Sequence, residues 1–339
     1  MQTGTSPSDI LYALMAVVLG PIVTYVLYWL LNALVNLFPR KISRALRPYV
    51  FIGPVLALVI GLLLYPTIQA VVGSFQTPAP TASDPFAQKW VGWLNFSKLF
   101  ADPNFMFTLR NNLEWIAIVP IVTVVLGILI ATLTDRMGPV RERVAKSIIF
   151  MPMAISFVAA SSIWRLTYSW NPPPQHQIGM LNAIIDFFGG KTMAWVQVEN
   201  FGVNNLLLMV VVVWSNVGFA MTLLSAAIKA VPDETIEAAA IDGANAVQSF
   251  FRIVLPQIRV TAVSVFITVL ISTMKIFDVI WGMTGGDFHT NVLGVEFFRQ
   301  YFVYNNPGKA SAIVVLLMIA IVPVMIYQIH TYRKQEDLR

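Results

Sequence analysis

The chain has 339 residues, of which 57% are hydrophobic and only 12% charged. In a soluble domain about a quarter of the residues are charged, so this composition excludes one. It predicts an integral membrane protein of the all-α class. Its formal net charge is +5, but no nucleic-acid partner is predicted, because the basic residues gather at the ends of hydrophobic runs. Cysteine is absent, which excludes disulfides and thiolate metal sites, and His176, His289 and His330 are too scattered to indicate a metal cluster.

A membrane-spanning helix needs about 20 mostly apolar residues, because hydrocarbon offers no partner to backbone N–H and C=O groups. Seven such runs are predicted, at residues 10–38, 49–75, 113–134, 147–169, 202–228, 259–283 and 309–329. The first run is too long for a cleavable signal peptide and lacks its basic lead-in, so it is expected to stay in the membrane. The prediction is a polytopic helical bundle with about seven transmembrane helices.

The placement of lysine and arginine predicts the orientation of these helices. Most basic residues follow the first, third, fifth and seventh runs: Arg40, Lys41, Arg44, Arg47, Arg136, Arg141, Arg143, Lys146, Lys229, Arg252, Arg259, Arg333, Lys334 and Arg339. Fewer lie on the other side: Lys89, Lys98, Arg110, Lys191, Arg299 and Lys309. The amino terminus is therefore expected outside and the carboxyl terminus in the cytoplasm, with the long segments 76–112 and 170–201 facing a soluble partner outside.

The segment 231–256 follows the fifth run on the predicted cytoplasmic side and reads VPDETIEAAAIDGANAVQSFFRIVLP. Pro232 suits a first helical turn, and Asp233 and Glu234 place negative charge at the positive end of the helix dipole. Gly243 is predicted to take a left-handed conformation that ends this short helix and turns the chain. A second short helix is expected to lay an apolar face on the bundle before the sixth span opens; the residues concerned are Val247, Phe250, Phe251 and, at the opening, Pro256.

The spacing within this segment resembles a family signature. Glu237-Ala238-Ala239, three residues, Gly243, nine residues and then Ile253-x-Leu255-Pro256 match the EAA loop of permease subunits in bacterial ATP-binding-cassette (ABC) importers. The surroundings are similar to the carbohydrate branch related to the maltose transporter: Val91-Gly92-Trp93-Leu94-Asn95-Phe96, Leu99-Phe100, Ile163-Trp164-Arg165, Val231-Pro232-Asp233 and Thr284-Gly285-Gly286. The chain departs from that branch at Asp287, where the family usually has proline.

The resemblance implies a fold and a division of labour. It implies a type I importer permease core of six helices at residues 49–335, after an additional transmembrane helix and basic linker at 1–48 and before a cytoplasmic tail at 336–339. The loop at about 231–256 would dock into a cytoplasmic ATPase, where Glu237 and Asp242 make polar contacts, Ala238 and Ala239 allow close approach and Gly243 sets the angle.

The same resemblance implies partners and a location. The implied partners are a second homologous permease, an ABC ATPase dimer, an extracellular or periplasmic solute-binding protein, a carbohydrate solute such as an α-glucoside, and membrane lipid. The implied location is the plasma (inner) membrane of a bacterium or archaeon.

No nucleotide site is predicted in this chain. Gly189-Gly190-Lys191-Thr192 looks like the end of a phosphate-binding loop, but Ile185 stands where that loop needs its first glycine. Zinc and Ser/His/Asp signatures are also missing from the sequence. We therefore expect a transport subunit rather than an enzyme, with no cofactor of its own and with ATP and Mg²⁺ bound by the partner ATPase.

Polar groups within the runs are candidates for a solute pathway, because they are costly in lipid. Alignment with maltose-type permeases puts these residues at the depth of that family's solute contacts: Met153, Ser215, Asn216, Phe219, Thr273 and Ile276. Core packing explains Met153, Phe219 and Ile276 equally well. Lys275 and Asp278 are further candidates, although two residues three apart on one predicted helical face can instead neutralise each other.

Two other functions stay open at this point. A secondary transporter driven by an ion gradient would use Lys275 and Asp278 as its coupling pair, but the internal repeats typical of such transporters are not found. An ABC permease for an anionic solute such as a glycerol phosphate would use Arg165 and Lys275. The full spacing from Glu237 to Pro256 favours an ABC importer over a secondary transporter, and the surrounding motifs favour a carbohydrate as its solute.

Overall fold

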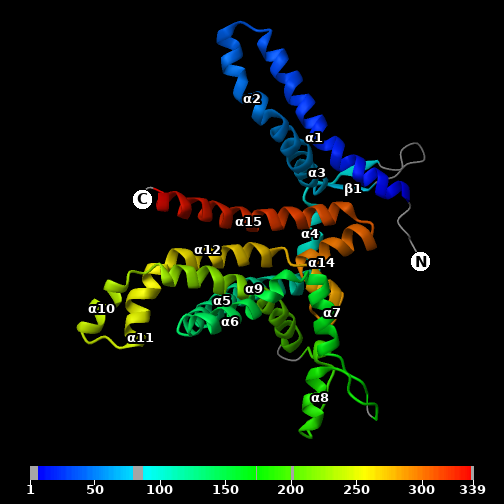
Figure 1. Ribbon diagram of the computed structural model, residues 1–339. Coiled ribbons are helices and arrows are strands. Elements are labelled where there is room, and N and C mark those ends of the chain that lie inside the picture. Colours follow the sequence, from blue (N-terminus) through cyan, green and yellow to red (C-terminus); the bar gives the residue numbers. More distant parts are fainter. Residues whose placement is uncertain (1–6, 79–86, 173, 200–201, 337–339) are drawn as a thin grey trace. The chain divides into compact units, whose positions relative to one another are not determined.

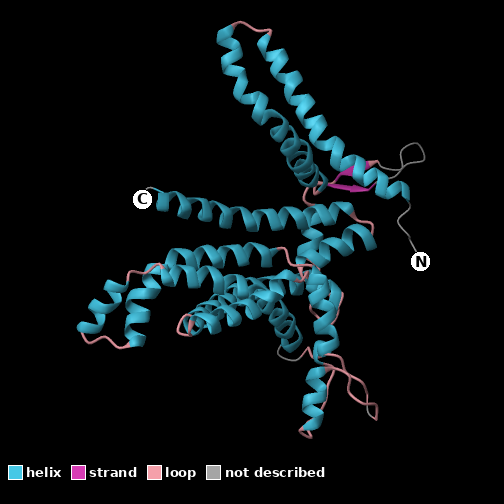
Figure 2. Ribbon diagram, viewed as in Figure 1, coloured by secondary structure: helices cyan, strands magenta, loops and turns pink. Residues whose placement is uncertain are grey.

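The computed structural model describes residues 7–78, 87–172, 174–199 and 202–336, and most of them are helical (Figures 1 and 2). The α-helices are α1 Pro7–Asn36, α2 Arg40–Val59, α3 Tyr65–Gly73, α4 Leu94–Phe100, α5 Pro103–Thr134, α6 Pro139–Phe150, α7 Phe157–Thr167, α8 Met180–Phe187, α9 Val203–Lys229, α10 Asp233–Ile241, α11 Ala246–Ser249, α12 Leu255–Met274, α13 Asp278–Met283, α14 Leu293–Phe298 and α15 Pro307–Glu336. Three π-helical segments, η1 Ile60–Leu64, η5 Phe250–Val254 and η6 Arg299–Val303, and two 3-10 segments, η2 Met151–Ala154 and η3 Trp195–Gln197, adjoin them. Two strands, β1 Gln76–Pro78 and β2 Gln88–Trp90, pair antiparallel. The helical class predicted from composition is confirmed.

Five helices among the described residues are long and apolar enough to cross a membrane: Arg40–Gly73, Pro103–Thr134, Val203–Lys229, Ala246–Met274 and Pro307–Thr331. The bent pair formed by α6–η2 and α7 would make a sixth. The first predicted run lies in α1, where most side chains before Tyr25 fall outside those described. The part of α1 from Tyr25 to Asn36 is apolar.

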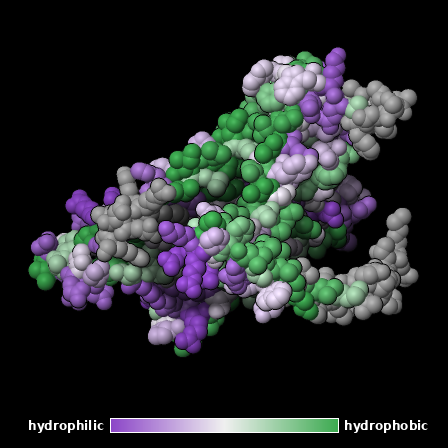
Figure 3. All heavy atoms as spheres, turned by 90° about the horizontal axis from the view of Figure 1, so that it is seen from above, coloured by the Kyte–Doolittle hydropathy of each residue, from purple (hydrophilic) through white to green (hydrophobic). Residues whose placement is uncertain are grey.

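Figure 3 shows broad areas of hydrophobic side chains on the surface, and Leu62, Leu129 and Ile326 are all more than half exposed. Such surfaces suit hydrocarbon rather than water.

The predicted span at 147–169 is not one helix. The chain is extended at Ile155 (φ −90°, ψ 135°) and Ser156, and the Ser156 hydroxyl accepts a hydrogen bond from the Ala159 N–H at 3.2 Å, which caps α7. The two arms bend by 103° at this break. The prediction of one unbroken helix over this run was wrong, because an N-terminal cap interrupts a run that hydropathy alone continues; that the bent pair crosses the membrane as one span stays a prediction.

The predicted span at 259–283 also ends early. Lys275 leaves the helix with φ −111° and ψ 25°, and α13 begins only at Asp278. The side-chain amide of Asn112 on α5 donates to the freed Met274 carbonyl at 3.3 Å, so the helix end finds a partner inside the protein. This second correction separates Lys275 and Asp278, which the sequence placed on one helical face.

Residues up to Val72 form a compact unit by themselves. In this unit α1 and α2 make a helical hairpin, and the rings of Tyr28 and Phe51 meet across it at 4.9 Å. The π turn η1 ends two residues before Pro66, and the Tyr65 N–H donates to the Ile60 carbonyl. A π turn makes room for the proline ring, so the helix continues through it.

The second unit, from Gly73 onward, is built around α5, α9 and α12. Trp115 of α5 and Leu208 and Met221 of α9 are fully buried in its core. Small residues bring the backbones close, as in other membrane helix pairs: a Cβ added at Gly127 would lie 2.7 Å from the Ala220 Cβ. A Cβ added at Gly218 would lie 2.5 Å from the Ile149 carbonyl oxygen of α6. The helix α9 is therefore held closely on two sides.

A smaller core lies where α15 meets α4 and α14. Its buried side chains are Phe96, Leu99, Phe105, Leu293, Ala312 and Ile313. The amide of Asn95 is buried and donates to the carbonyls of Ser74 and Gln76 at 2.9 and 2.8 Å, which fixes β1 to α4. The Trp93-Leu94-Asn95-Phe96 part of the sequence signature thus has a structural role.

Candidate functional site

The segment 231–256 forms a helical corner beyond the end of α9. Figure 1 shows α10 and α11 at one end of the bundle formed by α5, α9 and α12. Pro232 precedes α10 in an extended conformation (φ −60°, ψ 132°), and Asp233 and Glu234 occupy the first turn of α10. Negative charge at a helix amino end is favourable, so this start agrees with the prediction.

The corner itself is closed by two sets of local hydrogen bonds. Gly243 has φ +84°, the left-handed conformation predicted for it. Its N–H donates to the Ala240 carbonyl at 3.1 Å, and the Ala244 N–H donates to the Ala239 carbonyl at 2.9 Å, which together make a Schellman motif. These bonds satisfy the last carbonyls of α10 inside the corner.

The next helix begins at once with a capping box. The Asn245 side chain accepts from the Gln248 N–H at 2.9 Å, and the Gln248 side chain accepts from the Asn245 N–H at 2.9 Å. Only Asp242, Gly243 and Ala244 lie between the last residue of α10 and this box. The corner therefore joins two capped helices without a flexible linker.

The outer surface of the corner is small, apolar and exposed. Ile241 is 86% exposed, and Ala238, Ala240, Glu237 and Asp242 are exposed as well. Ala239 differs, because it is buried within the corner. The pair that the signature places together is thus divided: Ala238 is open to a partner, and Ala239 is buried inside the corner.

The second arm of the corner is continuous with α12. The residues from Ala246 to Met274 form one helix, in which the π turn η5 ends two residues before Pro256. Ile253 and Leu255 are half-buried along this arm. The predicted second short helix is thus present as α11 and η5, and it runs into α12 without an interruption of the helix, since the π turn makes room for Pro256.

The expected apolar face of that arm is mostly open. Val247 and Phe251 are 65% and 60% exposed, although they were predicted to lie on the bundle. Together with Leu129 and Leu133 of α5 they line an apolar groove of about 450 Å³. Only Phe250 of the predicted face is half-buried.

The predicted pathway residues occupy three environments. Ser215, Thr273 and Ile276 are buried, and the two hydroxyls donate to the carbonyls of Val211 and Val269 on their own helices at 3.0 and 2.8 Å. Asn216 and Phe219 are half-buried on α9, and Met153, Lys275 and Asp278 are exposed. The side-chain amide of Asn216 donates a hydrogen bond to the Val212 carbonyl at 2.8 Å.

Lys275 and Asp278 form no ion pair with each other within the described part of the chain, so mutual neutralisation was a wrong prediction.

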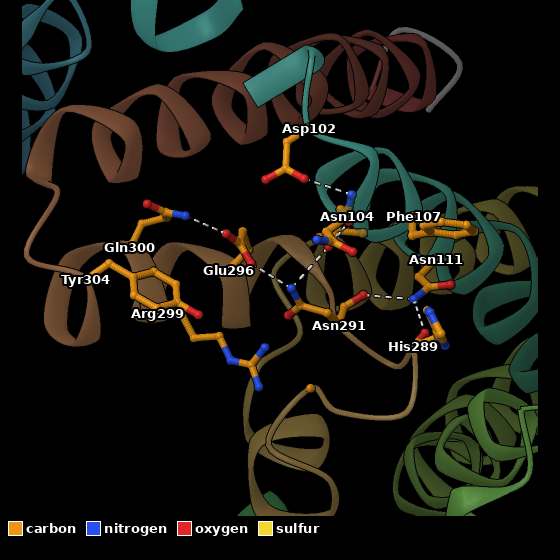
Figure 4. Close-up of a pocket in the computed structure, with 12 residues that line it drawn as sticks. Asp102, Asn104, Phe107, Asn111, His289, Asn291, Glu296, Arg299, Gln300 and Tyr304 are labelled. Atoms are coloured by element: carbon orange, nitrogen blue, oxygen red, sulfur yellow. Dashed lines mark hydrogen bonds between the residues drawn. The ribbon is translucent and has the colours of Figure 1, made fainter. Parts of the chain in front are cut away.

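A polar pocket lies at the other end of α5, where that helix begins. It has a volume of about 370 Å³ and is lined by Asp102, Asn104, Phe107, His289, Asn291, Glu296 and Arg299, among others (Figure 4). The Asn291 amide donates to Glu296 at 2.7 Å and to the Thr108 hydroxyl at 3.1 Å, while the Asn111 amide donates to the carbonyls of His289 and Asn291 at 2.6 and 2.9 Å. Amide, carboxylate and guanidinium groups of this kind suit a hydroxyl-rich ligand or a polar protein surface.

Asp287, where the chain departs from the resembling branch, has a defined role in this region. The Arg299 guanidinium donates to the Asp287 carboxylate at 2.7 Å and to the Gly285 carbonyl at 2.8 Å. Left-handed backbone occurs at Gly285, Gly286, Phe288 and His289, and the side chains of Asn111 and Asn204 hold the carbonyls of this turn. The ion pair fixes a strained turn that proline would stiffen by other means.

A nucleotide or metal site is not seen in the described part of the chain. Groups of three or more His, Asp or Glu side chains that could hold a metal ion do not occur among the described residues. Lys191 and Thr192 lie in a loop rather than at the start of a helix, unlike the residues of a phosphate-binding loop. The absence of a cofactor on this chain stays a prediction.

Comparison with known proteins identifies the family. A family model described as the inner membrane component of binding-protein-dependent transport systems matches residues 123–335, which is more than half of the chain and includes the corner. The chain belongs to this family of transport permeases. The permease is accordingly a multi-pass membrane transport subunit rather than an enzyme.

Relatives of the permease carry names of solute importers. It is 37% identical to the alpha-glucoside transport system permease protein AglF of Rhizobium meliloti (strain 1021), over 96% of this chain and 98% of that protein. It is 42% identical to the osmoprotective compounds uptake permease protein GgtC of Synechocystis sp. (strain ATCC 27184 / PCC 6803 / Kazusa), over 85% of this chain and 100% of that protein. The arabinooligosaccharides transport system permease protein AraP of Halalkalibacterium halodurans is 29% identical over 87% of this chain and 90% of that protein.

Solved structures agree with the fold of the permease. A bacterial ABC transporter involved in the import of the acidic polysaccharide alginate matches with a TM-score of 0.73 and 19% identity, over 87% of this chain and 98% of that chain. The alginate transporter in complex with an alginate pentasaccharide-bound periplasmic protein matches with a TM-score of 0.72 and 18% identity, over 87% of this chain and 96% of that chain.

Sequence reasoning missed the capping box and the polar pocket of the permease. The capping box could have been found, because Asn245-Ala246-Val247-Gln248 has its spacing. The polar pocket could not, because its residues come from two distant parts of the sequence, the start of α5 and the segment from the 284–291 turn through α14 and η6, which meet only in the folded chain.

Proposed function

We propose that the permease forms half of the translocation pathway of an ATP-driven importer and couples to a separate ATPase through residues 231–256, here called the coupling loop. The observation that carries this proposal is the helical corner at Gly243, which ends α10 in a Schellman motif and starts α11 in a capping box. A corner closed by its own hydrogen bonds can transmit a push without folding away. Membership of a binding-protein-dependent family removes the alternative of transport driven by an ion gradient.

The exposed surface of the coupling loop supports docking to a protein. Ile241 is almost fully exposed, and exposed apolar side chains flanked by charged ones are typical of interaction sites. Ala238 leaves space for close approach, and Glu237 and Asp242 offer carboxylates to the ATPase. In this assignment Ala239 contributes inside the corner rather than at the interface.

The two ends of the bundle are proposed to face opposite sides of the membrane. The polar pocket lies where α5 begins, and the coupling loop follows α9 near the residues where α5 ends. With 32 residues, α5 is about 48 Å long, enough to cross a bilayer. We place the pocket outside, toward the solute-binding protein, and the coupling loop and carboxyl terminus inside the plasma membrane of a bacterium or archaeon. A second permease would complete the pathway, and the helix α1 would add a seventh span.

The proposed solute is a carbohydrate, with an α-glucoside as the first candidate. The support is the printed name of the 37% identical relative, an alpha-glucoside permease, which aligns over nearly the whole of both chains. Asn216 and Phe219 on α9 combine an amide with an aromatic ring, which suits the hydroxyls and the apolar face of a sugar. The relative named for osmoprotective compounds makes other small hydrophilic solutes the second candidate.

The test is uptake by the complete importer, purified through this chain and placed in proteoliposomes. Maltose, trehalose and sucrose are offered with ATP and Mg²⁺ inside, with cellobiose as the β-linked control and glycerol 3-phosphate as the anionic control. We expect uptake of at least one α-glucoside that depends on ATP and binding protein and persists with an ionophore that collapses ion gradients. Uptake without ATP, or uptake abolished by the ionophore, would contradict the proposal; uptake of glycerol 3-phosphate alone would contradict the choice of solute.

A further inference from the structure

Four charged side chains from three helices meet beside the coupling loop, and we call them the four-charge cluster: Asp135, Glu142, Lys146 and Lys229. Lys146 Nζ lies 2.6 Å from Asp135 Oδ1 and 2.6 Å from Glu142 Oε1. Lys229 binds Glu142 as well, and its Nζ lies 3.8 Å from Asp135 Oδ1. Asp135 follows the last residue of α5, Glu142 and Lys146 lie on α6, and Lys229 ends α9. The cluster thus joins three helix ends.

Lys146 is the centre of this cluster. An ammonium group has three N–H donors, and those of Lys146 reach Asp135, Glu142 and the Ser225 hydroxyl. Ser225 in turn donates to Asp135 at 2.7 Å. The side chains of Lys146 and Asp135 are 21% and 11% exposed, so salt screens their attraction less than it would at the surface. Without Lys146, the half-exposed Lys229 would be the remaining cation of the cluster.

The cluster is connected to the coupling loop by a short and stiff stretch of chain. Only Ala230, Val231 and Pro232 separate Lys229 from the first residue of α10. Val231 is 6% exposed, and the ring of Pro232 restricts its φ angle. A displacement of α10 should therefore move Lys229 by a similar distance.

On its other side the cluster is connected to the broken span. Lys146 lies on α6, and η2 begins five residues later at Met151. The chain then bends by 103° between η2 and α7. A break of this kind absorbs changes of backbone angle, so movement of α6 can alter the angle of α7.

We propose that Lys146 is a positioning residue for transport: it ties the ends of α5, α6 and α9 together, so that the movement of α10 imposed by the ATPase also moves α6 and changes the bend before α7. This inference rests on the proposed function, because it names the residues that receive the movement of the coupling loop. A purely structural cluster would support the fold equally in all states. If the cluster transmits movement, its loss should allow ATP to be hydrolysed without a matching movement of solute.

The test compares solute moved per ATP hydrolysed in the complete importer, with an equimolar mixture of maltose, trehalose and sucrose as the probe. Lys146→Met removes the charge and keeps an unbranched side chain, and Lys146→Arg keeps the charge and the donors. Arg143→Met is the matched control, because Arg143 is an exposed cation on the same helix with no hydrogen bond or ion pair to the described residues. We expect Lys146→Met to lower the solute-to-ATP ratio by about fivefold or more, at unchanged complex yield, and Lys146→Arg and Arg143→Met to stay near the wild type.

A double-mutant cycle on Glu142 and Lys229 tests the same transmission with Lys146 itself unsubstituted. If the two act through each other, the variant carrying both Glu142→Gln and Lys229→Gln will have a ratio no lower than the worse single variant. Equal proportional losses of hydrolysis and uptake, with the ratio unchanged, would show a structural role only and overturn the inference. Failure of the inference is distinct from failure of the proposed function: in the first case Gly243→Pro uncouples while Lys146→Met does not, and in the second the wild-type importer shows no solute-stimulated ATP hydrolysis.

Discussion

Replacement of Gly243 by proline should disconnect the permease from its ATPase while leaving it in the membrane. Gly243 has φ +84°, whereas proline holds φ near −65°, so the backbone would have to turn by roughly 150°. The substitution also removes the N–H that donates to the Ala240 carbonyl at 3.1 Å. The strain and the lost bond together cost about 3 kcal/mol against the closed corner. Since each 1.4 kcal/mol is tenfold, the ratio of closed to open corners would fall by roughly a hundredfold.

The measured consequence is the affinity of the purified permease complex for the ATPase. The apparent affinity falls with the population of the competent conformer, so Gly243→Pro should weaken ATPase binding by up to about a hundredfold and abolish solute-stimulated hydrolysis. The amount of permease in the membrane should stay near that of the wild type, because the corner lies outside the helix core.

The chain offers a closely matched control in Gly189. This residue ends α8 with φ +72°, its N–H donates to the Asp186 carbonyl at 2.9 Å, and the Gly190 N–H donates to the Ile185 carbonyl at 2.8 Å, which is again a Schellman motif. Gly189→Pro therefore carries the same local cost at a different helix, and we expect it to keep ATPase binding. If the two variants bound the ATPase equally well, whether both as tightly as the wild type or both more weakly, the assignment of the corner as the coupling element would be refuted.

Three further outcomes are expected. The purified permease alone should hydrolyse no ATP, and appreciable turnover by a preparation shown free of ATPase subunits would contradict the division of labour. Because the chain has no cysteine, a single introduced cysteine can report which side of the membrane a residue faces. In right-side-out vesicles an impermeant maleimide should label the Lys191→Cys variant at once and the Asp242→Cys variant only after permeabilisation. The reverse order of labelling would invert the proposed topology. Gly218→Ala should lower the stability of the permease in detergent by about 1–3 kcal/mol, measured as a lower Tm, because its Cβ would lie 2.5 Å from the Ile149 carbonyl; Gly53→Ala, with nothing within 4 Å, should not lower it.

The first arm of the coupling loop and its corner at Gly243 were the part of the fold that the sequence predicted best, because local chemistry decides them. Acidic residues after Pro232 and a glycine after an alanine run specify a helix start and a left-handed stop without help from the rest of the chain. The same local rules explain Asn245 and Gln248, whose capping box was visible in the sequence but overlooked.

The spans were predicted less well, because hydropathy measures length and polarity but not direction. The cap at Ser156 and the helix end at Met274 occur inside apolar runs, and both depend on partners: a neighbouring N–H in the first case and the distant Asn112 in the second. The cluster around Lys146 was hidden for a related reason. Its charges were explained by topology alone, and only the folded chain brings Asp135 and Lys229 together.

The second arm of the coupling loop leads directly into α12 and meets it at an angle (Figure 1). The helix α12 has 20 residues, which at 1.5 Å per residue makes it about 30 Å long. If α12 pivots near the loop by about 10°, its far end moves by roughly 5 Å. That far end carries Lys275, next to the turn where the chain re-enters a helix at Asp278. A modest swing imposed at the ATPase therefore becomes a displacement wide enough, at the opposite tip, to admit or release a molecule of sugar size.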